Sequence, residues 1–436
     1  MEQYGEIRIP EIEEKRNRNK KTVIAAIAGC IVSAIVYIGA GTLIVKAYNS
    51  DERVLYRGFS NLVKEMGEQQ KLLADAGMAS GADGLGASKT EISLNLSGDN
   101  LPFTIGIDQS TLRDRNVHKL QSEMELSIMN YTFMECDIYG DDERVVVSLP
   151  DIFEQNLEFS PENIDRQYNR SLFAEMYGTI DETGISIDFF SEQKSDLISI
   201  EEFKELWEAK KPNEPIQISK VKRTDKQSGY STYRIVIPKE WIMFMESEIR
   251  DSVMEKNGVT GFEIMNDIAL LIDIEKNKRI TMISLEEPMQ YSVEYEGYVG
   301  IAKFDADISF LGEKRSIDDM EINIETEMLL GMLSSDGEND VWEDILPEDG
   351  KVNMGITAKY GYNENDASVT LDLDNVLISV DEFGSIKLTG EITEKPLKEK
   401  ITQPKGKTIK IFKMTEEEYE DLEEQLMDSL LGLMGY

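Results

Sequence analysis

The first pattern in the chain is a run without charged residues from Thr22 to Val45. An α-helix of that length rises about 35 Å, enough to cross the hydrocarbon core of a bilayer. Basic residues, which favour the inner side of a membrane, precede the run at Lys15, Arg16, Arg18, Lys20 and Lys21. The pattern predicts a cytoplasmic tail over residues 1–21, a transmembrane helix over 22–46 and an extracellular remainder, in a single-pass protein of the cell membrane.

Two other kinds of N-terminal segment compete with this helix. Val45-Lys46-Ala47 offers small residues to a signal peptidase, but the apolar run before it is longer than an ordinary signal-peptide core. Ile27-Ala28-Gly29-Cys30 is similar to a lipobox, yet the chain stays apolar after Cys30 where a lipidated chain usually turns polar. An uncleaved helical anchor is therefore favoured over both.

Residues 47–88 follow a helical period and then lose it. Apolar residues recur at spacings of three, four and seven between Asp51 and Ala76, which predicts an amphipathic helix. The stripe consists of Leu55, Phe59, Leu62, Met66 and Leu73. Packing on its own domain is favoured over pairing of two chains as a coiled coil. The Gly-, Ala- and Ser-rich residues 77–88 are typical of a linker.

From Lys89 the dominant period becomes two, the period of half-buried β-strands. Turn residues such as Asp99-Asn100 and Gly140-Asp141-Asp142 separate the alternating segments, and Asp273 to Ile280 is typical of a hairpin. The longest alternation extends from Tyr298 to Phe310 with polar residues between the apolar ones, as in an antiparallel sheet with one wet face. The first strands are marked by Ile92, Leu94, Leu96, Phe103, Ile105, Ile107, Met124, Leu126 and Ile128.

A few helices interrupt or follow the strands. Thr415 and Glu418 form a capping box ahead of an amphipathic C-terminal segment with Leu422, Leu426 and Leu430. Strands with separate helices predict an α+β fold: a single N-terminal transmembrane helix, then a large, curved, mostly antiparallel sheet with packed helices. The β-rich domain is expected over residues 89–436, with a break near 211–228 if it contains two subdomains.

One apolar face stands out among the predicted strands. Phe304, Ile308 and Phe310 share one side of the longest strand, and that side needs a cover. The apolar stripe of the C-terminal helix, with Leu422 and Leu426, is the candidate cover from the same domain. If the helix does not cover this face, an apolar ligand is the alternative.

Charge and cysteine content narrow the classes of partner. The net charge of −38 repels nucleic acid and anionic polymers, so no nucleic-acid partner is expected. The two cysteines are Cys30 in the predicted membrane segment and Cys136 in the β-rich domain, so no disulfide framework is expected. An exported domain without disulfides suits a Gram-positive bacterium better than a eukaryotic secreted protein.

Motifs for chemistry are sparse, and we predict no catalytic, cofactor-binding or metal-ligating residues. The single histidine, His118, adjoins turn-like residues and is expected at the surface. Ser191 to Lys194 fits a Ser-x-x-Lys motif without the Lys-Thr-Gly that completes it. The acidic segments 336–340 and 372–375 lack the glycine and glutamate of a calcium loop, so at most weak calcium binding is expected.

Two short segments carry a family resemblance. Arg144 to Phe153 followed by Tyr168 to Leu172, and the C-terminal stretch from Ile411 to Glu418, resemble uncharacterised membrane-anchored exported proteins of Clostridia-type Gram-positive bacteria. The architecture resembles the half-barrel of LolA- and LppX-like lipoprotein carriers, which implies a curved sheet with helices against its concave face. The resemblance brings no catalytic residues.

These patterns predict a membrane-anchored binding or interaction protein without enzymatic activity, which presents its sheet to a protein partner or to an apolar ligand. A carboxylate-based hydrolase of envelope glycans is the alternative, because many carboxylates make acid–base pairs unavoidable. A transmembrane sensor or regulator is disfavoured, because a tail of 21 residues is too short to fold alone. Homo-oligomers would form through the transmembrane or juxtamembrane helix.

Overall fold

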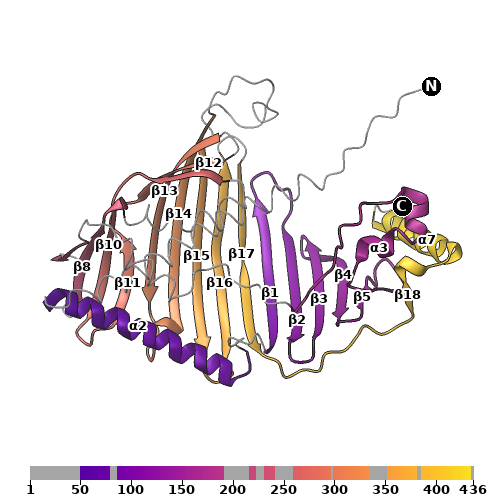
Figure 1. Cartoon of the computed structure of the whole chain (residues 1–436), viewed down its shortest axis with the longest axis horizontal. Coiled ribbons are helices and arrows are strands. Elements are labelled where there is room, and N and C mark those ends of the chain that lie inside the picture. The colour runs from indigo at the N-terminus through magenta and orange to yellow at the C-terminus, as the bar shows by residue number, and fades with distance from the viewer. Residues whose placement is uncertain are drawn as a thin grey trace. The chain divides into compact units, whose positions relative to one another are not determined.

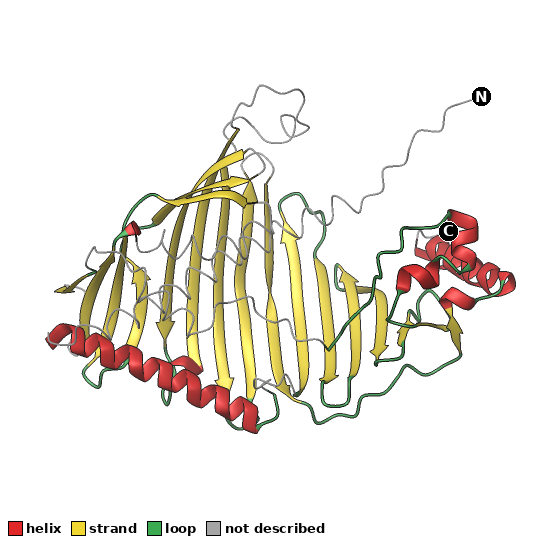
Figure 2. Cartoon of the chain, viewed as in Figure 1, coloured by secondary structure: helices red, strands yellow, loops and turns green. Residues whose placement is uncertain are grey.

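The computed structural model describes residues 50–78, 86–190, 216–221, 230–240, 259–295, 298–332, 351–380 and 384–433. Over these residues the chain is mostly β, with four α-helices (Figure 2). It divides into two compact units, which we describe separately. Unit 1 comprises Met1–Lys64, Ser195–Leu311 and Asn323–Met354, and unit 2 comprises Glu65–Lys194, Gly312–Ile322 and Gly355–Tyr436.

Antiparallel strands form the sheet of unit 1. Strand β10 pairs with β8 on one side and β11 on the other, and β7 pairs with β8. Strand β13 pairs with β12 and with β11, and β12 pairs in turn with β9. The bounds are β7 Gln217–Val221, β8 Tyr230–Ile237, β9 Val259–Ile264, β10 Ile268–Glu275, β11 Ile280–Leu285, β12 Met289–Tyr295 and β13 Tyr298–Phe310.

The core of unit 1 lies between this sheet and the first half of helix α2 (Ser50–Asp75). Leu55, Phe59 and Leu62 of the helix are buried, at exposed fractions of 0–4%. Gly58 brings the helix close to the sheet, since a Cβ there would lie 3.1 Å from Ile280 Cγ1. The largest fully buried side chains include Ile237, Ile264, Ile268, Leu270, Ile272, Ile274, Ile280, Met289 and Phe304.

The sheet of unit 2 runs in the order β16, β17, β1, β2, β3, β4, β5 and β6, all antiparallel, with β18 parallel to β6 (Figure 1). The bounds are β1 Ala87–Gly98, β2 Ile105–Asp114, β3 Lys119–Ile128, β4 Tyr131–Gly140, β5 Val145–Ser148, β6 Asn156–Phe159, β16 Ser368–Val380, β17 Gly384–Pro396 and β18 Thr408–Lys410. Strands β14 (Asp319–Met332) and β15 (Lys351–Asn363) contribute residues to both units.

Three helices of unit 2 lie near β5, β6 and β18 (Figure 2): α3 (Ile164–Tyr168), α4 (Leu172–Tyr177) and α7 (Glu416–Leu433). The backbone N–H of Glu418 donates to Thr415 Oγ1 at 3.3 Å, and the backbone N–H of Thr415 donates to Glu418 Oε2 at 2.9 Å. This reciprocal pair is the capping box that the sequence predicts.

Several local predictions are confirmed. Helix α2 covers Ser50–Asp75 against a predicted Asp51–Ala76, and its buried residues pack on its own unit. Strand β13 has the predicted bounds, Tyr298–Phe310, and residues 273–280 form the end of the hairpin of β10 and β11, as predicted. Period two and helical spacing are local properties of the chain, so they survive in the tertiary structure.

The predicted fold class is wrong: the chain is mostly β rather than α+β with a single transmembrane helix. Among the described helices none is long and apolar enough to cross a membrane. The longest of them, α2, has 26 residues but carries charged side chains along its length, including Asp51, Arg57 and Lys64. The predicted spanning segment, residues 22–46, and the subdomain break near 211–228 lie largely or wholly outside the described residues.

Candidate functional site

Strand registers in unit 2 align side chains into rows that cross the sheet. On β1 the odd-numbered residues from Glu91 to Asn95 point to one face and the even-numbered residues from Ile92 to Leu96 to the other. The neighbouring strands continue this alternation, so each face has its own chemistry. We call them the carboxylate face and the apolar face, and define each by its residues below.

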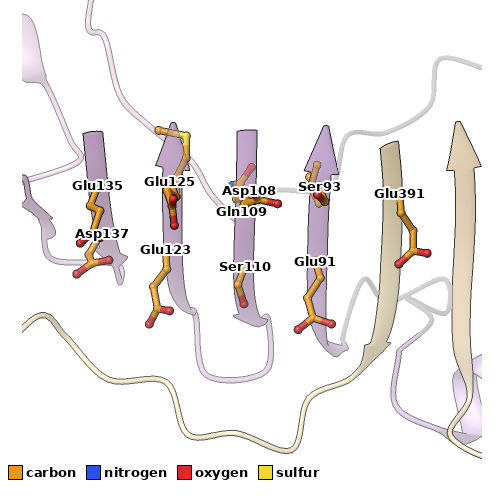
Figure 3. Close-up of a pocket in the computed structure, with 12 residues that line it drawn as sticks. Glu91, Ser93, Asp108, Gln109, Ser110, Glu123, Glu125, Glu135, Asp137 and Glu391 are labelled. Carbon is orange, nitrogen blue, oxygen red and sulfur yellow. The ribbon is translucent and has the colours of Figure 1, made fainter. Parts of the chain in front are cut away.

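The carboxylate face contains two adjacent rows. One row consists of Glu91, Ser110, Glu123 and Asp137, and the other of Glu391, Ser93, Asp108, Glu125 and Glu135. Figure 3 shows these side chains projecting from five neighbouring strands, β17 and β1 to β4. They line an open cavity of about 480 Å³. Seven carboxylates therefore share one shallow surface.

Two lysines offset part of this charge at one end of the face. Lys395 Nζ lies 2.6 Å from Glu91 Oε2, and Lys89 Nζ lies 2.9 Å from Glu91 Oε1. The hydrogen bond from Lys395, followed by that from Lys89, holds the pKa of Glu91 below its ordinary value. Glu91 is therefore a fixed anion with its own counterions.

Asp137 behaves in the opposite way. Burial and then the charge of Glu123, its cross-strand neighbour, raise the pKa of Asp137 above its ordinary value. A carboxyl group with a raised pKa beside a second carboxyl group is a pattern found at acid–base catalytic sites. The hydrolase alternative would depend on this pair. Within the described residues no group of three or more His, Cys, Asp or Glu side chains could hold a metal ion.

The apolar face lies on the other side of the same strands. Its central row consists of Leu373, Leu94, Ile107, Leu126 and Met134. A second row, on one side of it, contains Leu371, Ile392, Ile92, Gln109, Met124 and Cys136. A third row, on the other side, contains Val376, Leu388, Leu96, Ile105, Ile128 and Tyr131. Gly390 lies between Leu373 and Leu94 with a φ of +154°, and a Cβ there would overlap the backbone oxygen of Ser93 and lie 2.9 Å from Leu94 Cδ2, so the close approach of β17 to β1 requires a glycine.

Most residues of these three rows keep part of their surface exposed. The Leu, Ile, Val and Met residues of the rows are all half-buried, whereas Cys136, at the end of one row, is buried. A sheet face of aliphatic side chains without a complete cover is unfavourable in water, because each exposed apolar area costs free energy. Contiguous apolar patches of this kind mark binding surfaces more often than scattered exposed residues do.

The residues that the sequence analysis nominated as the apolar surface lie elsewhere. Phe304 and Phe310 are buried in unit 1, at 2% and 7% exposure, and Ile308 is half-buried in the same strand. Leu422 is buried in unit 2 with Ile409 and Met414. Its helix-mate Leu426 is 38% exposed.

Sequence reasoning identified the strands of the apolar face but not their role. The alternation of Ile92, Leu94 and Leu96 is the same signal as that of the buried strands in unit 1. The signal in the sequence that marks this strand is the polar composition of its other side, where Ser93 and Asn95 alternate with the apolar residues and are exposed.

His118 and the acidic segment 372–375 lie where solvated groups are expected. His118 lies in the turn between β2 and β3, with Nδ1 2.9 Å from Asp142 Oδ1 and its ring stacked on Phe190 at 5.2 Å. The carboxylate of Asp374 accepts a hydrogen bond from Lys359 Nζ at 2.6 Å, so it already has a cationic partner. The segments 191–194 and 336–340 and Cys30 lie outside the described residues.

Comparisons with known proteins add no family. No family model matches the chain, and no curated protein matches it. Among solved structures it is similar to OccK5 (OpdH) of Pseudomonas aeruginosa, with 8% identity, 71% of this chain and 96% of that chain covered, and a TM-score of 0.20. OprD of Pseudomonas aeruginosa matches with 7% identity, 74% and 97% coverage and a TM-score of 0.20. OccAB4 of Acinetobacter baumannii matches with 6% identity, 71% and 96% coverage and a TM-score of 0.13. Likenesses this weak carry no argument about function.

The predicted location is wrong as well. A single-pass protein of the cell membrane with an extracellular domain depends on a helical anchor, and none of the described helices can cross a membrane. The comparisons and the described helices assign no role to this chain.

Proposed function

We propose that unit 2 binds an apolar small molecule on its apolar face and does not change it covalently. The observation that carries the proposal is the set of three rows on β16, β17 and β1 to β4, whose aliphatic side chains are all half-buried. Moving one aliphatic side chain from water to an apolar environment contributes about 1.5–3 kcal/mol. A ligand that completes the burial of several such side chains recovers part of that free energy.

The composition of the face favours a hydrocarbon ligand over a protein partner. Protein interfaces concentrate their binding energy in Trp, Tyr and Arg anchors. The rows hold Leu, Ile, Val and Met residues, with Gly390 in the central row, Gln109 and Cys136 in another row, and one aromatic side chain, Tyr131, at the start of β4. Long parallel ridges of aliphatic side chains suit an alkyl chain, which needs area and few directed contacts.

The opposite face supports the same assignment. Its seven carboxylates disfavour an apolar ligand there, so an alkyl chain has one face to occupy. The carboxylates also keep the unit from stacking sheet on sheet with a second copy, because like charges would meet.

Binding of the neutral dye Nile red to the purified chain tests the proposal. Ile107 lies at the centre of the apolar face, and Ile107→Gln places an amide there. We expect this variant to weaken dye binding about tenfold, because a buried amide without partners opposes apolar contact. Native mass spectrometry of the wild type should show retained lipid that is lost in the variant.

Val117→Gln is the matched control, because Val117 is 58% exposed in the turn between β2 and β3. It should bind the dye as the wild type does, and both variants should keep the wild-type far-UV circular dichroism. Equal dye binding by folded Ile107→Gln and the wild type would contradict the proposal. Release of sugar from a glycan, lost in Asp137→Asn, would favour the hydrolase alternative instead.

A further inference from the structure

A second cavity of unit 2, of about 560 Å³, adjoins the apolar face. Ile92 connects the two, because it lines the cavity and also belongs to a row of the apolar face. Leu73 and Met78, from the end of α2 and the residues after it, and Val369 of β16 supply further apolar lining. The volume lies within the range of small-molecule sites, about 300–1,000 Å³.

Two arginines line the same cavity, although the chain as a whole carries a net charge of −38. Arg113 is the penultimate residue of β2 and Arg115 is the first residue after the strand, and both are partly buried. Two backbone hydrogen bonds fix the segments around this pair. The N–H of Arg115 donates to the carbonyl oxygen of Gly86 at 2.9 Å, and the N–H of Ala87 donates to the carbonyl oxygen of Gly77 at 2.8 Å. The position of the pair is therefore set by the strand and by the end of α2.

The guanidinium of Arg113 lacks a full set of partners. Its Nε is buried and has no hydrogen-bond partner among the described residues. Burial, followed by the charge of Arg115, lowers the pKa of Arg113, and the single opposing contribution comes from Glu394. A buried N–H donor without an acceptor costs free energy, and a cation beside a second cation costs more. An anion in the cavity would relieve both costs.

We infer that this cavity binds the oxyanion head group of an amphiphile whose alkyl chain lies on the apolar face. Arg113 and Arg115 supply donors that match carboxylate or phosphate oxygens, and Thr90 and Thr111 line the same cavity as neutral donors. Ile92 leads from the head-group cavity to the aliphatic rows. This inference rests on the proposed function and adds the charge class of the ligand to it.

Calorimetric measurement of the binding of four probes to the full chain separates binding of the alkyl chain from binding of the head group. The probes are dodecanol, dodecanoate, dodecyl phosphate and inorganic phosphate. We expect dodecanoate or dodecyl phosphate to bind at least tenfold more tightly than dodecanol, and the tighter of the two identifies the head group. Inorganic phosphate should bind weakly or not at all, because it lacks the chain.

The variant Arg113→Gln/Arg115→Gln should weaken binding of the anionic probe about tenfold or more and leave dodecanol binding unchanged. Arg170→Gln is the matched control, since Arg170 is exposed, belongs to unit 2 and does not line the cavity. It should change neither affinity. Ile107→Gln should weaken binding of all three alkyl probes.

Salt provides a measurement that does not depend on folding of the double variant. Raising the ionic strength should weaken binding of the anionic probe to the wild type and leave dodecanol binding unchanged. If dodecanol binds as tightly as both anions, the head-group inference is overturned while the proposed function stands. If no alkyl probe binds, the proposed function fails with it.

Discussion

Strands with the same alternation of apolar and polar residues are buried to different extents in the two units. In unit 1 the apolar side of β10 and β11 lies against α2, and side chains such as Ile272 and Ile280 are exposed by 0–1%. In unit 2 the apolar side of β1, β2 and β3 keeps Leu94, Ile107 and Leu126 half-buried. Alternation shows that one side of a strand is apolar, but it does not show whether another element of the chain covers that side.

The difference also shows what a cover requires. Helix α2 approaches the sheet of unit 1 closely because Gly58 has no side chain between the helix and Ile280. The helices α3, α4 and α7 of unit 2 gather instead around β6 and β18, where Leu422 packs with Ile409 and Met414. Among the described residues, the helices of unit 2 therefore leave its aliphatic sheet face half-exposed, and this is the observation on which the proposed binding role rests.

The largest expected effect tests this contrast directly. Phe304→Ala should lower the free energy of unfolding by about 3–5 kcal/mol, because it opens a cavity in a fully packed core. Leu126→Ala on the apolar face should cost about 1 kcal/mol or less, since Leu126 is already half in water. Urea denaturation of both variants provides the measurement. Similar losses would mean that the apolar face is as well packed as the core of unit 1.

A smaller pair of effects should appear within α7. Leu422 is 8% exposed and Leu426 is 38% exposed, one turn apart on the same helix. Leu422→Ala should cost about 2–3 kcal/mol and Leu426→Ala less than about 1 kcal/mol, measured by denaturation. A larger loss for Leu426→Ala would indicate that this residue packs on a surface that the described residues do not provide.

The smallest effect concerns the carboxylate face, where Glu123→Gln removes one of two causes that raise the pKa of Asp137. The pKa of Asp137 should fall but stay above its ordinary value, because burial is the larger cause. NMR titration of the Asp137 carboxyl provides the measurement, with Glu135→Gln as the control.

The sign for stability follows from the same shift. A carboxyl whose pKa is higher in the folded chain contributes stability at low pH, and that contribution is lost as the pH rises through the folded pKa. Because Glu123→Gln lowers the pKa of Asp137 in the folded chain, the variant should lose less folding stability from Asp137 as the pH rises. An unchanged pKa of Asp137 in the variant would contradict the electrostatic part of the account.

The sequence by itself determined the local elements of this protein. Helical spacing from Leu55 to Leu73 predicted α2, and strict alternation predicted the bounds of β13. The capping box of Thr415 and Glu418 predicted the start of α7. Each depends on neighbours within a few residues, where chain geometry fixes which side chains share a face.

Only the tertiary structure decided which apolar faces are core and which are surface. The sequence singled out Phe304 and Phe310 as an apolar face that needs a cover, and they are buried, whereas Leu94 and Ile107, with the same pattern, remain half-exposed. The carboxylate rows and the pairing of Arg113 and Arg115 in one cavity likewise depend on strand register and on how α2 ends. Burial depends on contacts between segments that are distant in the sequence. Alternation along one strand does not show which distant segment packs against its apolar side.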